Sequence, residues 1–340
     1  MAKIVFFGLK DWEQKYYQDK NIFSVLGIEP VFVDAILDDE HLPNSEASQA
    51  EIISIFVDSK VTTKVLSAFP NLKHIATRST GYDHIDLAVC KERGIIVSSV
   101  PGYGEVTVAE YAFALLLAYS RKIYDGVEKI KEQGDFSPEG LKGFDLCGKT
   151  IGIIGTGRIG KHAAGIAKGF GMKVVAYDVY PNEEAAKQIG FSYLSLEELL
   201  KNADVVSVHV PYTPENHHLI NKDKLALMKA SAVLINTARG ALIDTPALVE
   251  ALKNKTIAGA ALDVLEEEGV LKDEFGYVMG ANQEADMKAV LADHVLFDLP
   301  NVIITPHNAF NTQEALEKIL DTTAENIKSF LAGAPINLPK

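Results

Sequence analysis

The chain has 340 residues, of which 47% are hydrophobic, 23% charged and 8% aromatic. This composition is typical of a globular protein and excludes disordered and fibrous classes. Lys and Arg number 33 and Asp and Glu 46, so the formal net charge is −13, which disfavours nucleic acid and anionic membranes as partners.

The length predicts about two domains with a cleft between them. The two cysteines, Cys90 and Cys147, form no CxxC pair, so we expect free thiols in a reducing compartment, the cytoplasm. No signal-peptide pattern opens the chain, and residues 111–119, a tempting apolar run, fall well short of the roughly 20 residues of a membrane helix. We therefore expect neither export nor a membrane anchor.

Short runs rich in Val, Ile and Phe alternate with amphipathic stretches, the pattern of parallel strands joined by crossover helices. The expected fold class is therefore α/β. The first series of predicted strands comprises residues 4–7, 31–33, 52–57, 72–77 and 95–97. The second comprises residues 151–154, 174–177, 205–208, 233–236, 258–262 and 302–305. The first series forms one open sheet, and the six strands of the second suit a complete dinucleotide-binding sheet.

Two further segments define how the domains are connected. Residues 106–133 are helical in pattern and are predicted to cross from one domain to the other, followed by a linker over residues 134–148. Residues 312–331 are again amphipathic, and we expect them to return to the first domain because the second sheet is already complete. The first domain is thus predicted to be discontinuous.

The glycine motif Gly155-Thr-Gly157-Arg-Ile-Gly160 follows a predicted strand and opens a predicted helix. The first glycine permits a tight turn, the second lets the backbone approach a pyrophosphate, and the third lets helix and strand pack closely. Asp178 ends the next strand and can bind a ribose 2′-hydroxyl, whereas it would repel a 2′-phosphate. These residues predict NAD rather than NADP as cofactor.

Polar residues follow the later strands, where the carboxyl ends of a parallel sheet collect ligands. They are His209-Val210-Pro211, Thr237-Ala238-Arg239, Asp263 and Thr305-Pro306-His307. Reduction of a 2-oxo acid needs a cationic fork for the carboxylate and a proton donor for the carbonyl oxygen, roles that Arg239 and His307 suit. A carboxylate from residues 266–268 would keep the imidazole protonated to higher pH, although spacing alone does not choose among the three glutamates.

Five segments together resemble the D-2-hydroxyacid dehydrogenase family over essentially the whole chain: GTGRIG, HVPYTPENHHLIN, LINTARGALIDTPALVEAL, ALDVLEEE and ITPHNAF. Residues 77–83, the VPGY of residues 100–103, Phe310 and the long insertion before the last strand are most similar to the D-lactate dehydrogenase branch. The resemblance implies a Rossmann-type NAD domain over residues 101–307 and a flavodoxin-like substrate domain of residues 1–100 plus 308–340. It also implies a homodimer formed through the NAD domain.

The resemblance also implies the residue roles. Arg239 binds and polarises the oxo acid, His307 is the acid/base, and Glu268 is its partner. The substrate carboxylate meets Tyr103 and the backbone around Ser79, Thr80 and Gly81, while Phe310 shapes the side-chain pocket. The residues implied on the cofactor side are Gly155, Gly157, Arg158, Ile159, Gly160, Asp178, His209, Val210, Pro211, Asn216, Thr237, Ala238 and Asp263.

Alternatives remain at this level. Some members of this family are NAD-sensing corepressors, although the sequence favours an enzyme that reduces pyruvate or a related 2-oxo acid. Glu268 disfavours formate dehydrogenase, and Phe310 disfavours phosphoglycerate dehydrogenase. His217 and His218 are adjacent and so cannot share one helix or strand face, hence no metal site is expected. For His84 and His209 a hydrogen-bonded structural role is favoured.

Overall fold

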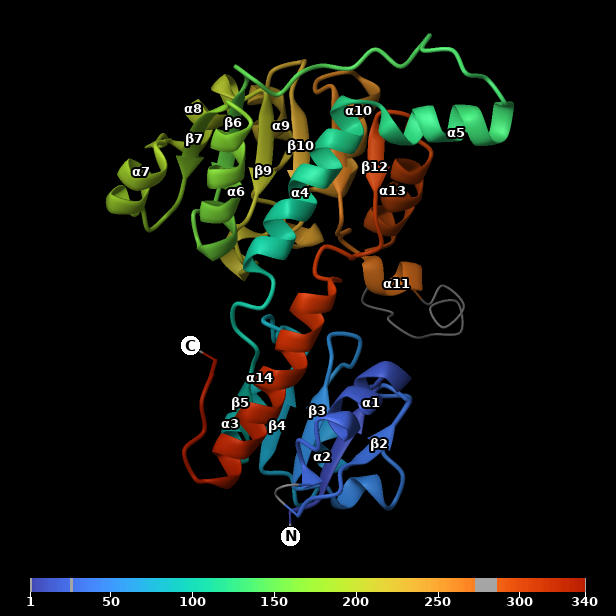
Figure 1. Cartoon of the computed structure of the whole chain (residues 1–340), viewed down its shortest axis with the longest axis vertical. Coiled ribbons are helices and arrows are strands. Elements are labelled where there is room, and N and C mark those ends of the chain that lie inside the picture. The colour runs from blue at the N-terminus through green and yellow to red at the C-terminus, as the bar shows by residue number, and fades with distance from the viewer. Residues whose placement is uncertain (1, 25–26, 273–285, 340) are drawn as a thin grey trace. The chain divides into compact units, whose positions relative to one another are not determined.

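The computed structural model describes residues 2–24, 27–272 and 286–339. The chain folds into two compact units, which we call the first unit (Met1–Tyr103 with Thr312–Lys340) and the second unit (Gly104–Asn311) (Figure 1). Each unit is built on one sheet, and all the strand pairs found in both sheets are parallel. The predicted α/β fold class is therefore confirmed. No helix in the described ranges is long and apolar enough to cross a membrane.

The sheet of the first unit has the order β2-β1-β3-β4-β5, which is the flavodoxin-like order. Its strands are β1 (Ile4–Phe7), β2 (Val31–Val33), β3 (Ile52–Ile55), β4 (His74–Thr77) and β5 (Ile96–Ser98). Its helices are α1 (Asp11–Asp19), α2 (Thr63–Ser67), α3 (Leu87–Glu92) and α14 (Gln313–Leu331), with a 3₁₀ turn at Ala47–Gln49. Along β1, Phe6 belongs to the core beneath α14 and Val5 to the core on the opposite face, so both faces of this strand are covered.

The sheet of the second unit has the order β12-β11-β10-β9-β6-β7-β8. Counted from β6, this is the dinucleotide-binding order 3-2-1-4-5-6 with one more strand at the edge. Its strands are β6 (Thr150–Ile154), β7 (Lys173–Tyr177), β8 (Ser192–Tyr193), β9 (Val205–Val208), β10 (Val233–Asn236), β11 (Gly259–Leu262) and β12 (Val302–Ile304). The chain order reverses between β6 and β9, the position where such sheets bind their ligands.

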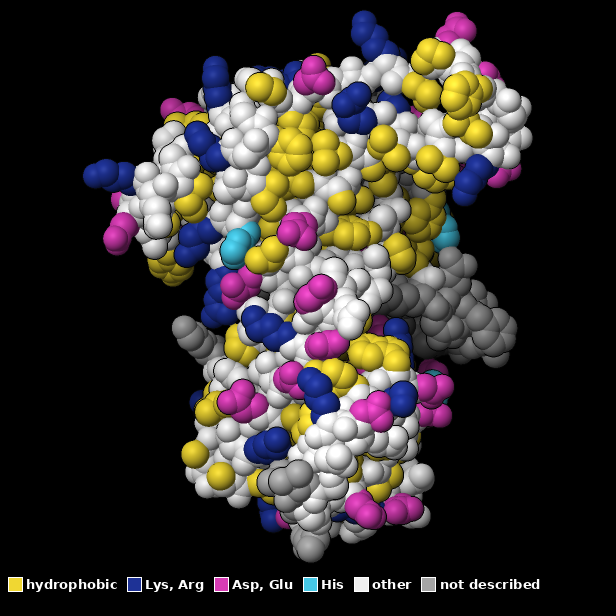
Figure 2. All heavy atoms as spheres, in the orientation of Figure 1, with side chains coloured by type: hydrophobic (Ala, Val, Ile, Leu, Met, Phe, Trp, Pro, Cys, Tyr) yellow, Lys and Arg dark blue, Asp and Glu magenta, His cyan; other side chains and the backbone are white. Residues whose placement is uncertain are grey.

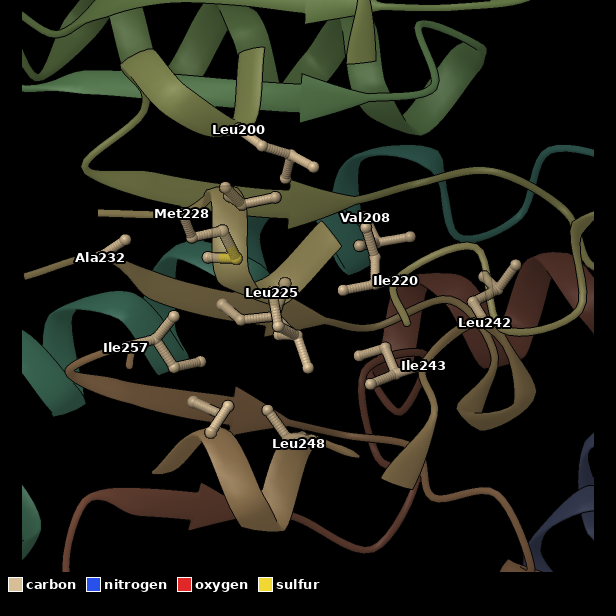
Figure 3. Close-up of a cluster of buried hydrophobic side chains, with 14 of the residues drawn as sticks. Leu200, Val208, Ile220, Leu225, Met228, Ala232, Leu242, Ile243, Leu248 and Ile257 are labelled. Carbon is tan, nitrogen blue, oxygen red and sulfur yellow. The ribbon is translucent and has the colours of Figure 1, made fainter. Parts of the chain in front are cut away.

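Helices cover both faces of this second sheet. The helices described in the second unit are α4 (Glu105–Ser120), α5 (Ile123–Gln133), α6 (Arg158–Gly169), α7 (Glu183–Ile189), α8 (Leu196–Asn202), α9 (Lys222–Leu227), α10 (Thr245–Lys253), α11 (Glu268–Lys272) and α13 (Met287–Phe297), with 3₁₀ turns at Pro214–Asn216 and Gly240–Leu242. On one face Leu200, Leu225 and Leu248 of α8, α9 and α10 pack on the strands (Figure 3). On the other face, α4 and α6 supply mainly alanine and leucine.

Two elements differ from the sequence-based prediction. Residues 106–133 form two helices rather than one, because Lys122 adopts a left-handed φ of 53° between α4 and α5. The second sheet has seven strands rather than six, since the two-residue strand β8 pairs with β7. A strand this short leaves no alternation in the sequence, although it occupies the third place of the dinucleotide-binding order.

Candidate active site

The glycine turn between β6 and α6 has three glycines with three different constraints. Gly155 has a φ of +93°, and a Cβ there would lie 2.7 Å from the Val210 side chain. A Cβ at Gly160 would lie 1.9 Å from the carbonyl oxygen of Gly155, so helix and turn are in direct contact. A Cβ at Gly157 would meet nothing within 4 Å. The backbone at Gly157 is therefore open to an approaching ligand at the N-terminus of α6, where an anion is favoured.

Asp178 follows β7 and is tied to the glycine turn. Its Oδ2 accepts hydrogen bonds from the backbone N–H of Thr156 at 2.6 Å and from the Thr156 hydroxyl at 2.9 Å. Thr156 is also hydrogen-bonded to Tyr193 at 2.7 Å. Sequence reasoning missed these two residues, yet they fix the carboxylate at the strand end. A carboxylate has lone pairs beyond these bonds, so Asp178 can still accept from a ribose.

Arg158, the first residue of α6, pairs with Glu105 of α4 through a 2.9 Å contact between Nη1 and Oε1. Ile159 beside it packs against the core between α4 and α6. Their side chains thus join α6 to α4. Both residues stand in the first turn of α6, whose N-terminus favours an anion.

The loop after β9 is shaped by its own side chains. His209 is buried and hydrogen-bonded to Ser207 at 2.9 Å, and burial lowers the pKa of His209 to about 4. Val210 lies against Gly155. Asn216 donates to the carbonyl oxygen of Pro211 and accepts from the backbone N–H of Thr213, both at 2.8 Å. The Asn216 side chain therefore closes the loop, and His209 is a neutral hydrogen-bonded histidine.

The loop after β10 carries Arg239. The buried side chain of Asn236 donates to the carbonyl oxygen of Arg239 at 2.8 Å and accepts from the backbone N–H of Ala238 at 3.0 Å. Arg239 Nη1 donates to the carbonyl oxygen of Ala238 at 2.8 Å. Asn236 was not predicted, and it fixes the backbone on both sides of the arginine. The buried hydroxyl of Thr237 has no hydrogen-bond partner in the described part of the chain.

The loop after β12, residues 305–310, is anchored on Asp263. The Asp263 carboxylate accepts from the Thr305 hydroxyl and from the backbone N–H groups of Asn308 and Ala309, at 2.9 and 2.8 Å for the last two. Burial raises the pKa of Asp263, although these hydrogen bonds oppose the shift. His307, with a left-handed φ of 50°, donates its backbone N–H to the carbonyl oxygen of Asp263 at 2.8 Å. All of these contacts come from the loop that presents His307.

His307 and Glu268 form the pair expected of an acid/base and its partner. Nδ1 of His307 lies 2.8 Å from Oε1 of Glu268, and both side chains are partly exposed. Because Nδ1 faces the carboxylate, Nε2 is the nitrogen that can meet a substrate. The ring of Phe310 stands edge-on to the imidazole, with the centroids 6.3 Å apart. The structure thus selects Glu268 among the three glutamates for contact with His307.

The substrate-side residues of the first unit lie after β4. The hydroxyl of Ser79 donates to the carbonyl oxygen of Gly81 at 2.6 Å, and that of Thr80 donates to the carbonyl oxygen of Val100 at 2.7 Å. Both hydroxyls therefore stabilise the loop itself. The substrate-binding role of this loop's backbone and of Tyr103, the last residue of this part of the unit, stays a prediction.

His217 and His218 lie in a turn, where the expectation drawn from helix and strand faces does not apply. The two rings are stacked with their centroids 3.8 Å apart, because His218 has a left-handed φ of 53° within a turn. Alternation holds in strands and not in such a turn. The other histidine singled out, His84, is hydrogen-bonded to Thr77 at 3.2 Å.

Residues 113–309 match the family model of the D-isomer specific 2-hydroxyacid dehydrogenase NAD binding domain. The chain belongs to the D-2-hydroxyacid dehydrogenase family. It is 37% identical over 335 residues to the D-lactate dehydrogenase of Escherichia coli, covering 97% of each chain. It is 41% identical over 298 residues to the glyoxylate reductase of Thermococcus litoralis, covering 85% of this chain and 83% of the other.

A solved structure of D-lactate dehydrogenase from Aquifex aeolicus, complexed with NAD and lactic acid, is similar over 99% of this chain and 100% of that one. Its TM-score is 0.86 and the identity is 37%. These findings confirm the predicted family, its D-lactate dehydrogenase branch and an NAD-dependent dehydrogenase.

The residues present in this dehydrogenase fit NAD. The open backbone at Gly157 leaves room for a pyrophosphate, and Asp178 stands at the end of β7 where a ribose hydroxyl is bound in such folds. The unpartnered hydroxyl of Thr237 is buried at the end of β10, and a buried polar atom needs a hydrogen-bond partner. A carboxamide could satisfy it. The carboxyl ends of β6, β7 and β10 thus each offer one group that can bind a part of NAD.

Proposed function

We propose that this dehydrogenase reduces pyruvate or a related 2-oxo acid to the D-2-hydroxy acid. The observation that supports the proposal most strongly is the 2.8 Å contact between His307 Nδ1 and Glu268 Oε1, which leaves Nε2 for the substrate. NADH, when bound, supplies the hydride that the carbonyl carbon takes up. The protein must then bind a carboxylate, polarise the carbonyl group and deliver one proton.

His307 delivers that proton. In reduction the imidazolium donates from Nε2 to the carbonyl oxygen, and in oxidation the neutral imidazole accepts the hydroxyl proton at the same nitrogen. The Glu268 carboxylate faces Nδ1 and orients the ring so that Nε2 is left for the substrate. Arg239, whose backbone is fixed by Asn236, offers a planar fork that can bind a carboxylate through two parallel hydrogen bonds.

We assign the substrate-binding loop to the first unit and NAD binding to the second. Because the hydroxyls of Ser79 and Thr80 already bind carbonyl oxygens within the first unit, the backbone N–H groups of residues 79–81 are the donors we assign to the substrate carboxylate, together with the Tyr103 hydroxyl. This assignment rests on the family resemblance of the segment.

Phe310 supports a substrate with an apolar side chain. Its ring stands beside His307 on the same loop, so a substituent next to the reacting carbonyl would meet an aromatic surface. Pyruvate carries only a methyl group and gains less from such contact than a longer side chain does. Each additional methylene is worth about 1 to 3 kcal/mol of discrimination. The similarity to a glyoxylate reductase makes glyoxylate the necessary small comparison substrate.

The test is a panel of 2-oxo acids assayed with NADH: glyoxylate, pyruvate, 2-oxoisocaproate and phenylpyruvate. We expect kcat/KM for at least one substituted acid to exceed that for glyoxylate, with the D-enantiomer as the product on chiral chromatography. Phe310→Ala should lower that preference. Preference for glyoxylate, or an L-product, would contradict the proposed substrate class, and absence of turnover with all four would reject the enzyme function.

We also propose a homodimer formed through α5. None of the side chains of this helix is buried, and Ile123, Val127 and Ile130 form an apolar stripe with exposed fractions of 46 to 55%. Hydrophobic side chains gather over this helix in Figure 2. A stripe at this spacing normally packs against another surface, and a second copy would cover it. The double substitution Val127→Glu and Ile130→Glu should yield monomers by light scattering, whereas Lys131→Glu should not.

The proposed compartment is the cytoplasm. Cys90 and Cys147 are both free thiols, one buried and one exposed, which suits a reducing environment. Location of a tagged chain by fractionation, against a marker for each compartment, tests this assignment.

A further inference from the structure

We propose that His217, His218 and Glu266 form a binding site for a divalent transition metal ion, of which Zn²⁺ and Co²⁺ are the probes. Each residue offers one ligand atom, and the three atoms lie within 4.8 Å of one another. This cluster is distinct from the His307–Glu268 pair. It lies where the turn before α9 meets the segment after β11.

The turn brings the two imidazoles to one side. Because His218 adopts the left-handed conformation, its ring stacks on that of His217 instead of pointing away from it. Nε2 of His218 lies 2.5 Å from Oε1 of Glu266. The Tyr212 hydroxyl contacts Nδ1 of His217 at 3.4 Å, a position from which it can orient that ring. A hydrogen bond to the ring nitrogen that does not face the ion is usual for histidines that bind metals.

The ligand-bearing segments are held in place by the fold. The backbone N–H of His218 donates to the carbonyl oxygen of Ala241 at 2.9 Å, and Ile220 bridges Ile243. The Glu266 side chain is only 8% exposed. A Cβ at Gly240 would lie 2.4 Å from the backbone nitrogen of Glu266, so the two segments are in direct contact. The backbone that carries the cluster is therefore fixed before any ion binds, and only the side chains must adjust.

The donor set determines which ions fit. Two imidazole nitrogens and one carboxylate oxygen suit Zn²⁺, Co²⁺, Ni²⁺ or Cu²⁺, whereas Mg²⁺ and Ca²⁺ prefer oxygen ligands. Bonds of about 2.0–2.1 Å at a tetrahedral angle separate ligand atoms by roughly 3.4 Å, so His218 and Glu266 must move apart by about 1 Å. His217 is exposed, which gives an ion access and leaves the fourth position to water.

The competing interpretation is that His218 and Glu266 form an ordinary hydrogen-bonded pair and that His217 merely stacks on it. The two interpretations differ in what His217 does. An ordinary pair does not need the exposed ring of His217, whereas a three-ligand site does. His217→Ala removes an exposed side chain and is expected to fold, so this variant decides between the two interpretations.

The experiment titrates the purified full-length enzyme, in the Cys147→Ser background, with Co²⁺ by visible absorption and with Zn²⁺ by calorimetry. The serine removes the exposed thiol as a ligand. We expect one equivalent to bind saturably, with d–d bands typical of tetrahedral Co²⁺. His217→Ala and Glu266→Gln should each weaken binding by at least about tenfold, the lower range produced by loss of an outer-shell partner. His162→Ala, which removes another exposed histidine, should leave binding unchanged.

Thermal unfolding supplies a readout that does not depend on spectra. Zn²⁺ should raise the Tm of the parent protein, since an ion that binds only the folded state stabilises it, and should leave that of His217→Ala nearly unchanged. The proposal is overturned if His217→Ala binds Co²⁺ as tightly as the parent protein, or if the parent shows no saturable binding.

Discussion

The carboxylate of Asp263 accepts a hydrogen bond from the backbone N–H of Ala309, 2.8 Å away, two residues beyond His307. With the bonds from Asn308 and from His307 itself, three consecutive N–H groups of this loop donate to one residue. They hold His307 in a left-handed conformation that costs a non-glycine residue free energy. Asp263 therefore positions the acid/base through the backbone.

Asp263→Asn tests this relationship. The amide replaces one acceptor oxygen by a donor, so at least one N–H of residues 308 and 309 loses its partner at a cost of about 1–3 kcal/mol. We expect a lower kcat and faster hydrogen exchange at residues 307–309. Thr305→Val, which removes only the hydroxyl donor, should have the smaller effect on both. Unchanged exchange in Asp263→Asn would show that the loop does not depend on this carboxylate.

Glu268→Gln tests the partner of His307. The amide preserves a hydrogen-bonding shape but removes the negative charge that pairs with the ring while it donates its proton. We expect reductive kcat/KM to fall while NADH affinity stays nearly constant. Glu267→Gln, one residue away, should leave reductive kcat/KM unchanged. If Glu268→Gln reduces the substrate as efficiently as the wild type, Glu268 is not the functional partner. His307→Ala should abolish most turnover in both directions while the protein remains folded.

Asp178 is expected to select NADH over NADPH. Its carboxylate is fixed by Thr156 and would repel a 2′-phosphate. We expect wild-type kcat/KM to be much higher with NADH. Asp178→Ala should lower the ratio of kcat/KM with NADH to kcat/KM with NADPH, mainly through KM. Asp145→Ala, which removes an acid elsewhere in the second unit, should leave this ratio unchanged. Comparable efficiency with the two cofactors in the wild type would refute this role.

Arg239→Lys should raise KM and lower kcat together, because an ammonium group cannot reproduce the planar fork that binds a carboxylate while polarising the adjacent carbonyl. Steady-state kinetics with the preferred 2-oxo acid measure both constants, and thermal unfolding measures stability. A purely structural arginine predicts the reverse result, in which the Tm falls and the kinetics change little.

Asp293 should make stability depend on pH. Its side chain is buried in α13 with one unpartnered oxygen within the described residues, and burial raises its pKa to about 7. Between about pH 4 and 7 the folded protein keeps a proton that the unfolded chain releases, so this residue makes the protein less stable as pH rises through that window. In denaturant unfolding, the free energy of unfolding of Asp293→Asn should rise relative to that of the wild type as the pH increases through the same window. Asp298→Asn, at an exposed position, should show the same pH dependence of stability as the wild type.

Much of the fold was predictable because strands buried on both faces leave continuous apolar runs. Predicted strands at residues 4–7, 205–208 and 233–236 coincide with β1, β9 and β10, all of whose residues are buried. Single backbone conformations were not predictable. The left-handed Lys122 divides one apolar helical pattern into two helices, and the left-handed His218 reverses the expected direction of a side chain.

The same distinction applies to the site. Strand ends identified Arg239 and His307, since topology alone gathers such residues at one edge. Asn236 and Thr156 were missed because their value lies in hydrogen bonds that form only on folding. Asn236 binds the backbone of its own loop at residues 238 and 239, and Thr156 donates to the carboxylate of Asp178. A polar residue at or just after a strand end was the available signal. Spacing alone could not choose Glu268 for contact with His307, since the three consecutive glutamates are equivalent in pattern. The family resemblance implied Glu268, and the structure brings the two side chains together.

The placement of α14 on the sheet of the first unit has a consequence for synthesis. Tyr17 donates to the carbonyl oxygen of Leu320, and Asn326 donates to that of Ser99. The sheet of the first unit therefore lacks part of its core until α14 has left the ribosome. The second unit has no such requirement, since its residues are contiguous. The first unit thus begins to be made before the second unit but is completed after it. During translation, the apolar face of its sheet that α14 later covers is the surface that a chaperone would bind.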